Sequence, residues 1–285
     1  MDRPRHLWPL MAVGVASISS AAVLIKLCQA GPLAVAFYRL GLASLLLWPV
    51  FLARRSWKEL DPGKLAWAVL AGLFLAMHFG LWLYSLSYTT VASSVVLVTL
   101  NPLFVGILGW LFLGERVGVR LVLAIALVIA GGLLISGGAL QAGGTAMKGN
   151  LLALGGALMA SLYLLAGRRL RVSMGIVPYA TVCYTATTLI LLAGCLALGV
   201  PLRGFPASTW LLFLGLALGP QILGHTVFNW GLRYLPASRI AMMIVAEPVG
   251  ATVLAFLVLA QAPTPGEMAG GALILAGVYL SAAVR

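Results

Sequence analysis

Ten runs of about 20 apolar residues fill almost the whole chain. Each run is long enough to cross the roughly 30 Å hydrocarbon core of a bilayer as a helix. The chain is 62% hydrophobic and 8% charged, whereas a soluble domain carries roughly 25% charged residues. The sequence therefore predicts an all-α integral membrane protein with ten transmembrane helices and short connections. These helices are expected at residues 7–28, 33–53, 64–87, 90–113, 118–137, 149–167, 175–198, 207–232, 238–260 and 266–284.

The basic residues are distributed unevenly between the two sides of this predicted bundle. With the N-terminus inside, fourteen of the 18 Lys and Arg residues fall on inner segments and three on outer ends. This asymmetry follows the positive-inside rule and predicts that both termini are cytoplasmic. The net charge of +12 is thus a topology signal, and no nucleic-acid partner is expected. The inner residues are Arg3, Arg5, Arg54, Arg55, Lys58, Lys64, Arg116, Arg120, Arg168, Arg169, Arg171, Arg233, Arg239 and Arg285; the outer ones are Lys26, Lys148 and Arg203.

The chain contains an internal repeat. A shift of 146 positions places Tyr88 on Tyr234 and Pro102 on Pro248, in each case with the proline in the middle of an apolar segment. Residues 1–140 and 141–285 then form two units of five helices each. Because five is odd, the second unit enters the membrane from the opposite side, so the two units are inverted. Interrupted helices at matching places in inverted repeats point to a transporter's binding site, with Pro102 and Pro248 as candidate hinges.

Two predicted helices, 118–137 and 266–284, carry few polar groups and are rich in Gly and Ala. Small residues let membrane helices approach closely, so these two are expected to serve as scaffold. The other eight carry the polar residues and are expected to surround a cavity.

Polar stripes mark two helices that are mates in the repeat. His78, Trp82 and Ser85 follow helical spacing on the first, and Gln221, His225 and Asn229 on the second. Unpaired polar side chains are costly in lipid, so both stripes must face protein or water. Interhelical hydrogen bonding and a shared cavity lining both explain them.

A carboxylate and a guanidinium lie inside the predicted spans. Glu247 is about 13 Å into its helix, near the midplane, and Asn101 is its uncharged mate. Glu247 is a candidate for proton coupling, for binding a substrate ammonium, or for bridging the break at Pro248. Arg39 lies roughly 9 Å from the outer side, where it can bind a substrate carboxylate, snorkel outward or hold a neighbouring helix. The aromatic candidates for an apolar pocket are Tyr38, Tyr163 and Tyr184.

Motifs of soluble enzymes are absent from the sequence. There is no GxSxG, HExxH or Walker loop, so no ATP site, no cofactor and no enzymatic activity are expected. Cys28, Cys183 and Cys195 show no ligand spacing, so no metal is expected either.

Three stretches resemble the signatures of EamA-type drug/metabolite transporters. They are AFYRLGLASLLL (36–47), NPLFVGILGWLFLGERVGVR (101–120) and AEPVGATVLAFLVLAQ (246–261). The family often ends both proline-containing helices with Leu-Gly-Glu; Leu113-Gly114-Glu115 keeps this pattern, and Ala260-Gln261 departs from it. The resemblance implies ten helices in the bacterial inner membrane and transport of small metabolites. Within the family, the chain looks most like exporters of aromatic and neutral amino acids.

The sequence thus favours a secondary exporter of amino acids or related metabolites that works by alternating access. Its expected partners are a small-molecule substrate, the lipid bilayer and, at Glu247, a proton. One alternative is an exporter of drug-like cations or sugar derivatives. A second is an intramembrane enzyme, which would need paired carboxylates or a nucleophile–base pair in the spans. Substrate, direction, proton coupling and oligomeric state stay open.

Overall fold

The computed structural model describes residues 4–85, 87–89, 94, 97–98, 100–114, 118–135, 144–260 and 262–282, all of whose regular structure is helical. Most of the first eleven residues of the predicted helix 90–113 lie outside the described residues, as do Arg3, Glu115, Arg116, Gln261 and Arg285. In chain order the helices are α1 (Leu7–Ser19), α2 (Ala21–Leu27), α3 (Pro32–Ala53), η1 (Ser56–Glu59), α4 (Pro62–Ser85), α6 (Asn101–Leu113), α7 (Val119–Ile135), α8 (Gly144–Arg171), α9 (Ile176–Ala197), α10 (Ala207–Leu216), η2 (Ala217–Thr226), α11 (Val227–Gly231), α12 (Ala237–Ile244), α13 (Glu247–Leu259) and α14 (Pro265–Ala282).

Seven helical stretches in the described part of the chain are long and apolar enough to cross a membrane. Three shorter apolar helices, Asn101–Leu113, Val119–Leu134 and Met268–Ser281, accompany them. Each of the ten predicted apolar segments therefore coincides with helix, and the prediction of an all-α, multi-pass membrane protein is confirmed. The crossing of the membrane by all ten and the inversion of two halves stay predictions.

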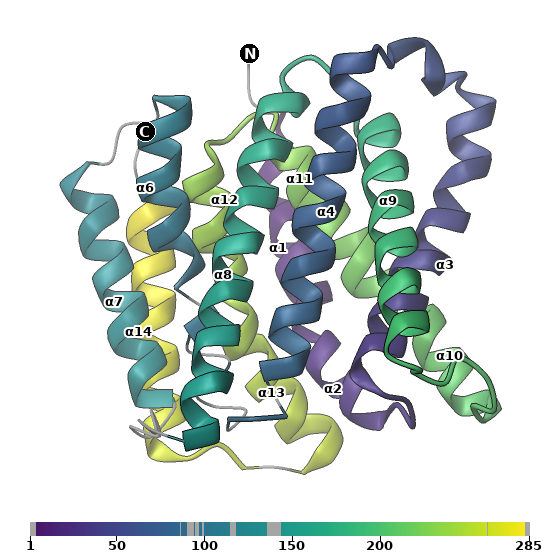
Figure 1. Cartoon of the computed structure of the whole chain (residues 1–285). Coiled ribbons are helices and arrows are strands. Elements are labelled where there is room, and N and C mark those ends of the chain that lie inside the picture. The colour runs from purple at the N-terminus through teal and green to yellow at the C-terminus, as the bar shows by residue number, and fades with distance from the viewer. Residues whose placement is uncertain are drawn as a thin grey trace.

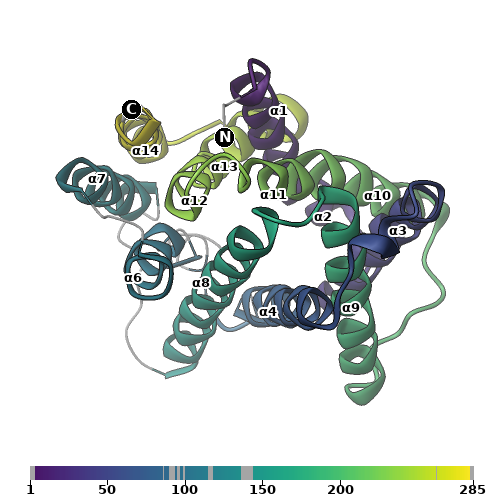
Figure 2. The ribbon, with the colours of Figure 1, turned by 90° about the horizontal axis from the view of Figure 1, so that it is seen from above.

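The helices stand side by side, and Figure 1 marks the N- and C-terminal ends of the chain at the same end of the bundle. The helix α8 packs along α4 and α6, and α9 packs along α3 and α4. On the other side α1 packs against η2 and α13. Seen from above, α7 and α14 lie together at one edge, apart from α3 and α9 (Figure 2). The predicted scaffold pair is thus peripheral.

Both predicted proline interruptions are present as helix boundaries. The helix α12 ends at Ile244, and α13 begins at Glu247, directly before Pro248. Between them the N–H of Ala246 donates to the carbonyl of Met243 at 3.1 Å, a tighter turn than an α-helix makes. The helix α6 likewise begins at Asn101, directly before Pro102. Proline has no N–H to donate, so it suits the first turn of a helix and ends the helix before it.

Glycine allows α7 and α14 to approach each other closely. A Cβ at Gly131 would lie 2.5 Å from the carbonyl oxygen of Gly270, and one at Gly277 would lie 2.7 Å from that of Ala124. Both obstacles are backbone atoms, which a side-chain rotation cannot move. The small residues of these two segments are therefore required by packing, as the sequence suggests.

This contact predicts that Gly131→Ala destabilises the protein. Overpacking of this kind costs about 1–3 kcal/mol, and thermal unfolding in detergent measures it. Gly80→Ala is the control, because it is also a mid-helix glycine and a Cβ there meets nothing within 4 Å. Equal unfolding temperatures for the two variants would contradict the close approach.

Candidate functional site

A cavity lies between the helices where several of them are interrupted. Its volume is about 140 Å³, roughly ten times the space that holds one water molecule. Its walls come from α1, α2, α3, α4, α6, α8, η2, α12 and α13, and from Val98 and Val245 beside them. No described residue of α7 or α14 lines it, as expected for scaffold. None of α9 does either, so the prediction that all eight polar-bearing segments surround the cavity is wrong for that helix.

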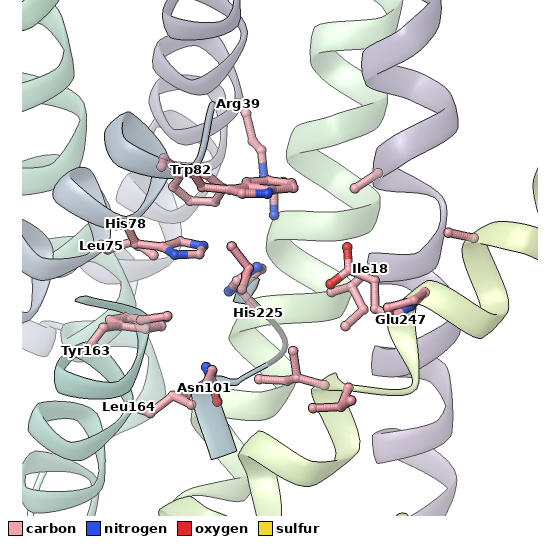
Figure 3. Close-up of a pocket in the computed structure, with 18 residues that line it drawn as sticks. Ile18, Arg39, Leu75, His78, Trp82, Asn101, Tyr163, Leu164, His225 and Glu247 are labelled. Carbon is pink, nitrogen blue, oxygen red and sulfur yellow. The ribbon is translucent and has the colours of Figure 1, made fainter. Parts of the chain in front are cut away.

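The structure brings together most of the residues that the sequence suggests for a site (Figure 3). The lining includes Arg39, His78, Trp82, Asn101, Tyr163, His225, Glu247 and Pro248. Three candidates, Tyr38, Tyr184 and Gln221, and the candidate hinge Pro102 are not among its lining residues. A substrate-binding role for any of them stays a prediction.

His78 and Trp82 form one wall, one turn apart on α4. Their rings stack with centroids 6.0 Å apart and planes at 9°. The Nδ1 of His78 lies 2.9 Å from the carbonyl oxygen of Gly156 in α8. A carbonyl only accepts, so Nδ1 carries a proton, and in the neutral ring Nε2 is an acceptor. Ser85, the third member of the predicted stripe, instead donates to the carbonyl of Trp82 at 2.6 Å and lies away from the cavity.

Arg39 is held inside the protein, 3% exposed, so of its three alternatives outward snorkelling does not hold. Its Nε donates to Oε1 of Gln221 at 2.8 Å, which ties α3 to η2. Its guanidinium carbon lies 4.8 Å from the centre of the Phe79 ring, a cation–π contact. No further hydrogen bond from this guanidinium is formed with the residues that the structure describes, so its terminal nitrogens remain available at the cavity.

The stripe Gln221, His225, Asn229 does not lie on one continuous α-helix as its spacing predicts: Gln221 and His225 lie in η2, and only Asn229 lies in the α-helix α11. The segment η2 is a π-helix with Pro220 inside it, and α-helix resumes at Val227. Single π-helical turns are rare and often occur at functional sites. Here the wider turn directs Gln221 to Arg39 and places His225 in the cavity wall.

A second layer of polar groups lies behind the cavity wall. Nδ2 of Asn229 donates to the hydroxyl of Tyr163 at 2.5 Å and lies 3.5 Å from that of Tyr184. The Tyr184 hydroxyl is 2.9 Å from Oγ1 of Thr226. Tyr163 reaches the cavity, and Tyr184 supports it from behind.

Tyr38 belongs to a separate aromatic cluster. Its hydroxyl donates to the carbonyl of Leu202 at 2.6 Å, and its ring packs on Phe213 with centroids 4.7 Å apart and on Trp210 at 4.8 Å. Its neighbour in sequence, Arg39, faces the cavity instead, because adjacent positions of a helix point in different directions.

Glu247 lies at the first position of α13, partly exposed to the cavity. A negative charge is favourable at this position, because it is the N-terminus of a helix. Glu247 and Arg39 are both described by the structure, and no ion pair within 4.0 Å joins them. Two buried polar atoms of lining residues, Nε1 of Trp82 and Oδ1 of Asn101, have no hydrogen-bond partner in the described part of the chain. Native proteins rarely bury such atoms unpaired, so the cavity has places for water or a polar ligand.

The apolar residues of the cavity wall could not be identified from the sequence. They include Ile18, Leu75, Phe79, Leu164 and Ile244. Membrane helices are apolar on the lipid side as well, so hydropathy does not distinguish these residues from lipid-facing ones. For Phe79, its position next to His78 is a signal that could have indicated it.

The fold and cavity define a class of protein: a multi-pass helical membrane protein with an internal site that is apolar but has charged groups. The EamA-like transporter family matches residues 6–137 and again residues 147–283. The chain belongs to this family, so it is a membrane transporter, a class that does not usually carry out catalysis.

Individual known proteins agree with this assignment. The uncharacterized transporter YyaM of Bacillus subtilis is 26% identical over 265 residues, which are 89% of this chain and 85% of that protein. An uncharacterized transporter of Archaeoglobus fulgidus is 28% identical over 74 residues, 26% of this chain, and the match spans only 27% of that protein. One protein of known crystal structure has the same fold, with a TM-score of 0.83 and 21% identity, over 98% of this chain and 97% of that one.

The Arg39–Gln221 contact predicts different effects for two substitutions of Gln221, which is fully buried. Gln221→Leu leaves a buried guanidinium without its acceptor and should cost about 1–3 kcal/mol or more. Gln221→Glu keeps an acceptor oxygen there and should cost less. Thermal unfolding in detergent compares them.

Leu223→Ala is the control for this comparison, since Leu223 lies in the same π-helix and is 50% exposed. A Gln221→Leu variant as stable as Leu223→Ala would show that Arg39 does not depend on this hydrogen bond.

Proposed function

We propose that this transporter exports amino acids with aromatic or neutral side chains across the bacterial inner membrane. Support comes from one observation above all: Arg39 and Glu247 line the same cavity, on α3 and α13, without forming an ion pair. In Figure 3, Arg39 and Glu247 enter from different sides the space that His225 also lines. A zwitterion brings a carboxylate for a guanidinium and an ammonium for a carboxylate.

The uncharged groups of the cavity suit the same kind of substrate. The acceptors Nε2 of His78 and Oδ1 of Asn101 complement an ammonium, and the donor Nε1 of Trp82 complements a carboxylate. The stacked rings of His78 and Trp82 and the apolar wall formed by Leu75 and Phe79 provide a surface for an apolar side chain.

We also infer alternating access by two inverted five-helix halves, residues 1–140 and 141–285. The separate matches to 6–137 and 147–283 support the duplication, and the odd number of apolar segments in each half supports the inversion. The interruptions before Pro102 and Pro248 occupy matching places in the two halves. The basic residues on inner segments support cytoplasmic termini.

A cationic drug-like cargo is the second candidate. Glu247 is the one carboxylate in the described cavity wall, and no hydrogen bond from a described residue occupies it. The same group is the candidate for exchange of a proton against cargo. Both ideas require a negative charge at this position, whereas only the amino-acid proposal requires Arg39 as well.

Transport by liposomes that contain the purified protein separates these candidates. For labelled amino acids, Arg39→Gln and Glu247→Gln should each lower the rate at least tenfold, because each removes a charge-assisted contact worth roughly 1.5–3 kcal/mol. For a cationic cargo only Glu247→Gln should do so. Arg203→Gln is the control, because Arg203 lies outside the cavity.

Amino-acid flux at the wild-type rate in both cavity variants would refute the proposal. A pH gradient across the vesicles tests proton coupling.

The candidate hinges have their own test. Pro102→Ala and Pro248→Ala allow helix to continue through the interruptions, so we expect flux to fall several-fold while the unfolding temperature holds. Pro49→Ala is the control, because Pro49 lies inside α3, on its exposed side. Wild-type flux in the two variants would show that Pro102 and Pro248 are tolerated in these helices but do not act as hinges.

A further inference from the structure

The turn between α3 and α4 keeps an arginine where the backbone favours glycine. The helix α3 is capped by Arg54, and Arg55 follows with φ 50° and ψ 40°, in the left-handed region. Glycine is the usual residue at this place after a helix, because it has no Cβ to clash. The presence of an arginine in this unfavourable backbone conformation suggests that its side chain has a role of its own.

Three basic side chains at this turn have no partner. Arg54, Arg55 and Lys58 are exposed, and their side chains form no hydrogen bond or ion pair with any residue that the structure describes. The two acidic residues beside them are already engaged. Glu59 accepts from the backbone N–H of Gly175 at 2.6 Å, and Asp61 accepts from the N–H of Lys64 at 2.8 Å and pairs with its ammonium at 3.0 Å.

The pairing of Asp61 fixes its charge as well as its position. The hydrogen bond from the backbone of Lys64, and then the contact with its side chain, lower the pKa of Asp61. Asp61 therefore stays ionised at neutral pH and neutralises Lys64. Glu59 is then the one described acidic side chain of the turn that offsets Arg54, Arg55 and Lys58, and the turn keeps an excess of positive charge.

Two exposed tryptophans lie beside Arg54, Arg55 and Lys58. Trp48 and Trp57 are 36% and 45% exposed, and both pack on the buried ring of Phe51, with centroids 5.0 and 6.3 Å away. Tryptophan is enriched at the level of lipid headgroups. The turn is also fixed in place, since the Glu59–Gly175 hydrogen bond attaches η1 to the start of α9.

We propose that the α3–α4 turn, through Arg54, Arg55 and Lys58, binds the phosphate of an anionic phospholipid in the adjacent leaflet. Guanidinium groups suit phosphate oxygens, and clusters of basic residues next to a membrane helix attract anionic lipids. The rings of Trp48 and Trp57 lie at the level of the glycerol and upper acyl chain. The site is separate from the cavity and independent of the cargo that the cavity accepts.

Native mass spectrometry of the full-length protein tests this with phosphatidylglycerol and phosphatidylcholine of identical acyl chains. The wild type should retain phosphatidylglycerol roughly tenfold or more over phosphatidylcholine, and R54Q/R55Q/K58Q should lose most of this preference. R5Q/R120Q/R233Q removes the same charge from other connections on the same predicted side and should keep it. Equal retention of both lipids by the wild type, or an unchanged preference in R54Q/R55Q/K58Q, would overturn the proposal.

Arg55→Gly separates binding from folding. Glycine relieves the left-handed backbone, so this variant should unfold at a temperature no lower than the wild type and yet bind less phosphatidylglycerol. An unchanged lipid preference in Arg55→Gly would show that Arg55 has no part in binding. A thermal shift by inorganic phosphate as large as that by phosphatidylglycerol would also overturn a lipid site.

Discussion

The hydrocarbon core offers no hydrogen-bond partner to a polar group, and this constraint decides where the helices of this protein are irregular. Among the residues that the structure describes, four apolar segments depart from α-helix: at Ser20, before Asn101, through the π-helix η2 and at Val245–Ala246. Residues at or beside every one of these departures line the same cavity, namely Ile18, Ala21, Asn101, His225, Val245 and Glu247. The irregular parts of these helices thus lie around one cavity. Pro49 is the contrast: it lies on the exposed side of α3, which continues unbroken.

If the chain is duplicated as proposed, the two halves differ at this cavity. Both copies are interrupted before their prolines, yet one carries Glu247 and the other Asn101. The break at Ser20 and the π-helix η2 have no counterpart in their mates, since α8 and α4 are continuous. The symmetry that supports alternation of the halves is therefore combined with an asymmetric charge distribution. An asymmetric site binds a zwitterion in one orientation, whereas a symmetric pair of sites would not.

The helices could be predicted from sequence because membrane segments are long, apolar and separated by polar turns. The interruptions before Pro102 and Pro248 could be predicted because proline lacks an N–H, whereas nothing in the sequence indicated the break at Ser20. The π-helix could not, since the spacing of Gln221, His225 and Asn229 fits an α-helical stripe equally well. Tyr38 and Arg39 show a second limit: hydropathy places both in one helix, but only packing decides which faces the cavity. Apolar lining residues such as Leu164 resemble lipid-facing ones, because both surroundings select the same side chains.

Gln221 holds Arg39 in place without neutralising it, so the buried positive charge can still interact with a ligand. A carboxylate in place of Gln221 would neutralise the guanidinium, and a buried ion pair has little charge left for a ligand. The neutral amide fixes the Nε side of the guanidinium at 2.8 Å, and the Phe79 ring lies against it at 4.8 Å. The terminal nitrogens keep their charge towards the cavity, in a position set before any substrate arrives. Glu247 likewise remains unpaired with Arg39, so each charge is available to a separate part of one ligand. A closed ion pair between the two would leave neither group available to a ligand.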